Sequence, residues 1–138
     1  LGNTAHKFMD DFVNVERESE SKRILLKVMS SRNIEVKLLL AKKKYLSENR
    51  QEEFDIVQQK MVKVSKQYKN FQVKYFDHEP TQSIFLFDDE CFIGPIFKDL
   101  ASHDTPALHM KCGGSFTKKY MNYFDAEWQI AEEINLNE

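Results

Sequence analysis

Two periodicities alternate along this chain, and their order constrains the fold more than any other feature. The stretch 34–40 begins with polar–apolar alternation and ends fully apolar, which is typical of a strand covered on both faces of its sheet. The stretch 47–68 carries apolar residues three or four positions apart, which predicts a helix with one apolar face. Period two returns over 71–76. Helices that alternate with apolar strands favour an α/β protein with a layered mixed sheet flanked by helices.

The flanking segments extend this pattern. The amino-terminal region, with Thr4 at the N-cap, has two apolar stripes at helical spacing, over 8–13 and 24–29. Short strands are expected at 83–87 and 91–93 around a turn, and a further strand at 105–111. A carboxyl-terminal helix then follows, with an aromatic face that we expect in the core, formed by Phe116, Tyr120, Tyr123, Phe124 and Trp128.

Composition indicates one folded domain. The 138 residues are 41% hydrophobic and 12% aromatic, with a formal net charge of -2, so we expect a single domain over 1–138. A nearly neutral chain has no global positive field, which makes nucleic acid a weak candidate partner. No apolar run approaches the roughly 20 residues that span a bilayer. The chain begins at Leu1-Gly2 without an initiator methionine, which suggests a fragment of a longer protein.

Cysteine and acidic residues give no sign of a cross-linked or metal-bound fold. Cys91 and Cys112 form neither a disulfide framework nor a CxxC motif. Two isolated thiols are typical of a reducing compartment, so we expect a cytoplasmic location. The acidic residues and histidines at 77–79, 88–90 and 103–104 match no metal-ligand spacing. We therefore expect neither a metal ion nor another cofactor.

Four stretches, taken in order, resemble the phospholipase D-like family. Residues 31–40 (SRNIEVKLLL) match the family's GVxVx[IL]L strand, with Asn33 where glycine is usual, and residues 71–76 match its vxvxx[FY] strand. The signature HxKxxxxD, followed by a hydrophobic strand and a glycine, falls on 81–95, and the closing yFxxxW helix falls on 123–128. The resemblance covers most of the chain. It implies one phospholipase D-like domain whose partner is a second such domain or a second copy in a homodimer.

The signature residues themselves depart from the family's pattern. In the family, the histidine attacks phosphorus to form a phosphohistidine, the lysine neutralises phosphate oxygens and the aspartate orients the histidine. Here Thr81 stands in the place of the histidine and Ser83 in the place of the lysine, and only Asp88 is retained. A hydroxyl group supplies neither the basicity nor the charge of the lost residues. The resemblance therefore implies a catalytically degenerate domain that acts as a ligand-sensing, binding or oligomerisation module of a larger protein.

Two groups of residues are candidates for binding a ligand that contains phosphate. Lys42, Lys43 and Lys44 follow an apolar strand at its carboxyl end, where open α/β sheets place ligand-binding loops. Thr81 and Ser83, together with Asp88, would occupy the family's phosphate pocket and offer hydroxyl groups to a ligand. The alternatives are lysines that simply face water and a pocket filled by its own side chains.

An enzyme is the second hypothesis. His78 lies just before Thr81, near a strand end where a site would open, and is a candidate acid, base or nucleophile. His109 shares parity with Thr105 on the expected strand 105–111 and would line the same cavity. A phosphodiesterase or nuclease with a rearranged site would then use His78, Thr81, Ser83 and His109. Since a lone loop histidine is more often solvated or capping, the noncatalytic hypothesis comes first.

Overall fold

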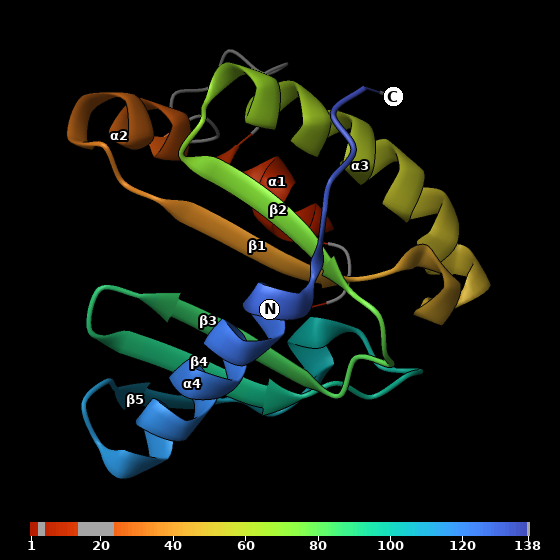
Figure 1. Ribbon diagram of the computed structural model, residues 1–138. Coiled ribbons are helices and arrows are strands. Elements are labelled where there is room, and N and C mark those ends of the chain that lie inside the picture. The colour runs from red at the N-terminus through yellow and green to blue at the C-terminus, as the bar shows by residue number, and fades with distance from the viewer. Residues whose placement is uncertain (3–4, 14–23, 138) are drawn as a thin grey trace.

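The computed structural model describes residues 1–2, 5–13 and 24–137, and these form the mixed α/β arrangement that the periodicities predict (Figure 1). The N-cap expected at Thr4 lies outside the described residues. The amino-terminal helical region forms two helices, and a two-residue strand is added at the carboxyl end. In chain order the elements are α1 (His6–Phe12), α2 (Ile24–Arg32), β1 (Val36–Ala41), the 3-10 turn η2 (Lys43–Tyr45), α3 (Glu48–Gln67), β2 (Phe71–Phe76), β3 (Gln82–Phe87), β4 (Glu90–Pro95), the 3-10 turn η3 (Ser102–Asp104), β5 (Leu108–Lys111), α4 (Ser115–Ile130) and β6 (Glu132–Glu133).

Two three-stranded sheets form the middle of the molecule. In the first, β1 and β2 are parallel, with Val36 opposite Phe71, and β6 pairs antiparallel with the other edge of β2. In the second, β3, β4 and β5 are antiparallel neighbours. The connection between β1 and β2 is α3, because parallel strands need a crossover of a dozen or more residues.

Residues 1–2 join the two sheets edge to edge. The Gly2 N–H donates to the Leu39 carbonyl at 3.0 Å, and the Gly2 carbonyl accepts from the Ala41 N–H at 3.3 Å. On the other side, the Leu1 amine donates to the Ile84 carbonyl at 2.7 Å, and the Ile84 N–H donates back to the Leu1 carbonyl at 3.0 Å. These bonds connect β1 and β3 into one hydrogen-bonded layer.

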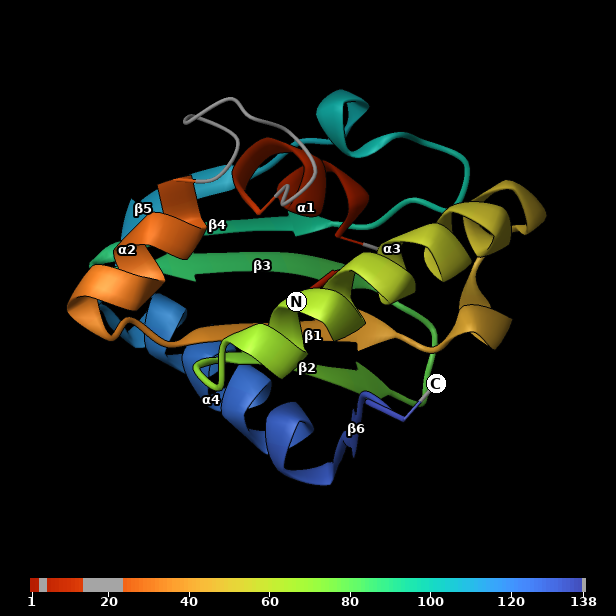
Figure 2. The same ribbon diagram turned by 90° about the horizontal axis from the view of Figure 1, so that it is seen from above.

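Helices cover both faces of this layer. Helices α1, α2 and α3 lie on one side of the sheets and α4 lies on the other (Figures 1 and 2). The side chain of Lys74 on β2 contacts the end of α4. Its Nζ donates to the Trp128 carbonyl at 3.1 Å and lies 4.9 Å from the centre of the Trp128 ring. A cation at the end of a helix satisfies carbonyls that have no partner within the helix.

The larger core lies under α1–α3. The buried side of α3 repeats every three or four residues, at Phe54, Val57, Met61 and Val64, and meets Phe71 and other buried residues of β1 and β2. A smaller core lies under α4, where Ile84, Cys91 and Ile93 pack against Tyr120 and Tyr123. Among the helices that the structure describes, none is long and apolar enough to cross a membrane.

Two residues other than glycine adopt positive φ angles at functional-motif positions. Asn33, just before β1, has a φ of 52°, and Asp88, in the two-residue loop between β3 and β4, has a φ of 50°. The short polar side chains of Asn and Asp tolerate the left-handed region better than most residues do. Asn33 thus takes the backbone conformation that a glycine commonly provides, and Asp88 shapes a hairpin turn.

The strand expected at 105–111 begins later, at Leu108. Pro106 has no N–H to donate to a strand ladder, and its carbonyl oxygen lies against β4. A Cβ atom on Gly94 would lie only 2.5 Å from that oxygen. The close approach of β4 to the segment before β5 therefore depends on glycine at position 94, and Thr105 lies outside the strand that it was expected to share with His109.

Candidate functional site

The three signature positions lie apart along β3. Thr81 precedes the strand, is exposed, and accepts a hydrogen bond from the Ile96 N–H at 2.9 Å through its carbonyl. Ser83 is exposed on the strand opposite Gly94, on the sheet face away from buried Ile84. Asp88 is in the turn at the far end, roughly 20 Å from Thr81 at about 3.3 Å per residue. Asp88 therefore does not reach the positions of Thr81 and Ser83 within this chain.

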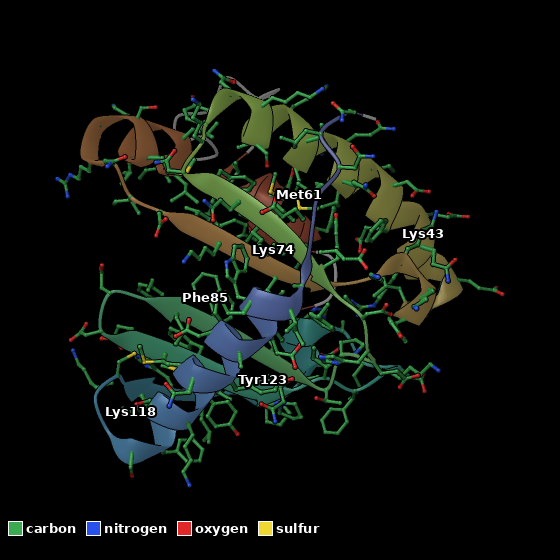
Figure 3. All side chains as sticks on the ribbon, viewed as in Figure 1. Lys43, Met61, Lys74, Phe85, Lys118 and Tyr123 are labelled. Carbon is green, nitrogen blue, oxygen red and sulfur yellow. The ribbon has the colours of Figure 1, made fainter. Side chains whose placement is uncertain are left out.

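The charges of the lysine triplet are matched by acidic side chains. Lys42 Nζ lies 2.9 Å from Asp77 and 2.6 Å from Glu132, and Lys44 Nζ lies 2.6 Å from Asp77. Lys43, on the η2 turn beside α3 (Figure 3), lies 2.6 Å from Asp55. A phosphate group at this strand end would have to compete with three carboxylates that already hold the ammonium groups.

Asp77 is the centre of this ion-pair group. Its carboxylate accepts hydrogen bonds from Lys44, Lys42 and the Tyr45 hydroxyl, the last at 2.8 Å. These donors hold the pKa of Asp77 far below its usual range, with Lys44 contributing most. Asp77 is therefore ionised at any physiological pH and serves to anchor η2 to the end of β2.

His78 has acceptors at both ring nitrogens. Its Nδ1–H donates to the Glu79 carbonyl at 2.9 Å, and Nε2 lies 2.9 Å from a carboxylate oxygen of Glu127 on α4. The ring also stacks on Phe76, with 4.5 Å between ring centres. Partial burial alone would lower the pKa of His78, but the hydrogen bonds to Glu79 and Glu127 outweigh it and raise the pKa above its ordinary value. Because acceptors lie against both ring nitrogens, neither nitrogen is open to a substrate for attack on phosphorus or for general-base catalysis.

This arrangement predicts a pH-dependent stability. Because the pKa of His78 is higher in the folded state, the protonated ring stabilises the fold most below the unfolded-state pKa of about 6.5, and this contribution disappears as the pH rises through the folded-state pKa. Glu127→Gln should therefore lower the free energy of unfolding more at pH 5.5 than at pH 8.5, as measured by urea unfolding. Glu133→Gln, on exposed β6, is the matched control. Equal losses at both pH values for Glu127→Gln would contradict the ion pair.

His109 lies on another face of the molecule. It pairs with Glu90 and stacks on Phe92 with 4.3 Å between ring centres. Phe92 in turn stacks on Phe87 at 5.9 Å and belongs to an aromatic row on the face of the β3–β5 sheet that carries Ser83. Phe85 of this row contacts Phe8 of α1. The structure thus places His109 with Ser83 and α1, and places His78 with α4, so the four residues of the enzyme hypothesis do not form one cluster.

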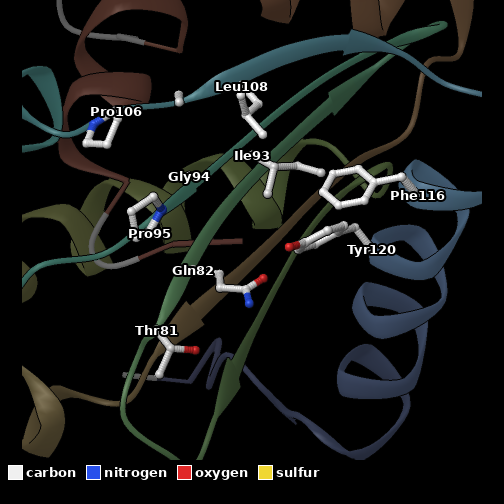
Figure 4. A pocket seen from close by; sticks show the side chains of 10 residues that line it. Thr81, Gln82, Ile93, Gly94, Pro95, Pro106, Leu108, Phe116 and Tyr120 are labelled. Carbon is white, nitrogen blue, oxygen red and sulfur yellow. The ribbon is translucent and has the colours of Figure 1, made fainter.

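A cavity of about 400 Å³ opens between the β3–β5 sheet and α4 (Figure 4). Of the candidate site residues predicted from the sequence, Thr81 lines it. Its other lining residues are Gln82, Ile93, Gly94, Pro95, Pro106, Ala107, Leu108, Phe116 and Tyr120. The wall is apolar and aromatic with two polar side chains from the start of β3, which is the usual character of a small-molecule site.

Gln82 supplies an unusual polar group at this cavity. Its Oε1 atom is buried and has no hydrogen-bond partner in the part of the chain that the structure describes. A buried acceptor left without a donor costs about 1–3 kcal/mol of stability.

Two aromatic residues of this site were expected in the core. Phe116 and Tyr120 belong to the aromatic stripe of α4, but the stripe divides along the helix. Trp128 is 7% exposed, whereas Phe116 is 49% exposed at the mouth of the cavity. Helical spacing alone cannot tell which end of an apolar stripe reaches past the edge of the sheet. Phe116 and Tyr120 lie near the start of the helix, next to Gly113 and Gly114. This position is the local sequence signal for the exposed end of the stripe.

A second depression lies at the amino ends of β1 and β2. It is lined by Asn33, Glu35, Lys69 and Asn70. The Asn70 amide is already used, since it donates to the Ile34 carbonyl at 2.7 Å and to the Met29 carbonyl at 3.3 Å. These bonds hold the turns before β1 and β2, which gives the polar residues here a structural role.

No metal centre is formed by the described residues, since no three side chains of His, Cys, Asp or Glu come together among them. No family model matches this chain, and comparisons with curated proteins and with solved structures return no match either.

Proposed function

We propose that this chain is a phospholipase D-like domain without the family's chemistry, and that it acts as a noncatalytic binding module. The order of elements from β1 to α4 supports the first part, because it reproduces the order of motifs on which the resemblance is based. Thr81 and Ser83, at the positions of the family's histidine and lysine, support the second. Neither hydroxyl has a histidine or lysine partner among its described hydrogen bonds.

The observation that carries this proposal is the hydrogen bonding of the His78 ring. A nucleophilic or general-base histidine needs one ring nitrogen free to accept a proton or to attack. In this chain, Glu79 and Glu127 accept from the two nitrogens, and the pKa of His78 is raised by these bonds against the effect of burial. The ring thus links the end of β2 to α4 and presents no open nitrogen.

A hydrolysis assay tests the proposal. The purified chain should release p-nitrophenol from bis(p-nitrophenyl) phosphate no faster than buffer does, and should leave single-stranded DNA uncut. His78→Ala and the control His6→Ala should behave like the unmodified chain. Turnover that His78→Ala abolishes and His6→Ala retains would overturn the noncatalytic function and favour the enzyme hypothesis.

A further inference from the structure

We propose that the cavity between the β3–β5 sheet and α4 binds a small, uncharged aromatic molecule. This inference rests on the proposed binding function and goes beyond it by naming the class of ligand. It also differs from the phosphate-containing ligand that the lysine triplet suggested.

The size and lining of the cavity set the first two limits. Its volume of about 400 Å³ is near the lower end of the range of roughly 300–1,000 Å³ for ligand pockets, which fits one small molecule. None of its ten lining residues is an Asp, Glu, Lys, Arg or His. A charged ligand would lose its water without gaining a counter-ion, so the cavity favours an uncharged one.

The α4 wall indicates that the ligand is aromatic. Phe116 and Tyr120 lie on successive turns of α4, with 5.2 Å between ring centres and 55° between ring planes. Phe116 is 49% exposed at the cavity mouth. A planar ligand inserted beside these rings would bury their exposed faces in the offset or edge-on arrangements that aromatic rings prefer.

Gln82 limits the ligand on the β3 side. Its side chain faces the same space as the Tyr120 ring from α4 (Figure 4), but its Oε1 atom is buried and offers a ligand no acceptor. The cavity therefore recognises its ligand by shape and by apolar contact.

Indole is the probe for this site. In an NMR titration of the ¹⁵N-labelled chain, indole should shift amide signals around the cavity. 1-Methylindole, which lacks the N–H, should bind about as tightly, because the contacts are apolar.

Two tryptophan variants separate the cavity from the rest of the surface. Leu108→Trp places a larger side chain at the cavity wall and should weaken indole binding at least tenfold, whereas Ile130→Trp, at a position 80% exposed and outside the lining, should leave it unchanged. Absence of indole binding at millimolar concentration, or equal binding to Leu108→Trp, would overturn the inference. So would inorganic phosphate that competes with indole. Each of these outcomes leaves the hydrolysis result unaffected, so failure of the ligand class and failure of the noncatalytic function are distinguishable.

Discussion

Phe76→Ala should lower the free energy of unfolding by about 3–5 kcal/mol, the usual loss when a buried phenylalanine is truncated. Phe76 is 1% exposed at the end of β2 and belongs to the larger core. Its ring also supports His78, whose ring lies 4.5 Å away in a stacked arrangement. The variant therefore removes core packing and the surface that orients His78 toward Glu127. Urea unfolding measured by circular dichroism gives the loss.

The matched control is Phe87→Ala on the β3–β4 hairpin. Phe87 is 47% exposed and contacts Phe85 and Phe92 on the face of the sheet that carries Ser83. Its loss should lower the free energy of unfolding by less than about 1 kcal/mol, because little buried area is removed. Similar losses for Phe76→Ala and Phe87→Ala would contradict the placement of the core.

Gly94→Ala should also destabilise the fold, by about 1–3 kcal/mol, the range found when extra atoms are forced into a packed site. The added Cβ would lie 2.5 Å from the Pro106 carbonyl oxygen and 3.3 Å from Ala107 Cα. Both contacts are with backbone, so the segment before β5 must move. Because Gly94, Pro106 and Ala107 line the cavity, indole affinity should fall together with stability.

Gly2→Ala is the control for this substitution. Among the residues that the structure describes, a Cβ on Gly2 meets no atom within 4 Å, so this change should leave the free energy of unfolding within about 0.5 kcal/mol of the original chain. A stable Gly94→Ala variant with unchanged indole binding would show that the Pro106 segment does not approach β4 as described.

The central part of the fold was predictable from the sequence because local patterns dominate there. Local patterns predict three elements there. The apolar run forms β1, the spaced apolar residues form α3 and the alternating residues form β2. Pairing between distant segments is different. The link between the two sheets consists of only Leu1 and Gly2, and β6 consists of two exposed glutamates. Segments of two residues are too short to carry a periodic signal.

The candidate site was predictable only in part. Thr81 lines a cavity, but it precedes the first paired residue of β3, and Ser83, expected in the same pocket, faces the other side of the sheet. The lysine triplet was visible in the sequence, whereas its partners Asp55, Asp77 and Glu132 come from later elements of the fold. These ion pairs join residues that are far apart in the sequence. They depend on the tertiary structure and leave no local sequence pattern.

Intact-protein mass spectrometry after quenching at alkaline pH tests the central claim most directly, because the P–N bond of a phosphohistidine survives in alkali but hydrolyses in acid. The family's route passes through a covalent phosphohistidine, so a chain that follows it gains the mass of the transferred phosphoryl group during incubation with a phosphodiester. The noncatalytic account predicts an unchanged mass at every time point, for the original chain and for His78→Ala alike. A covalent phosphoryl adduct that appears on the original chain and is lost in His78→Ala would contradict it.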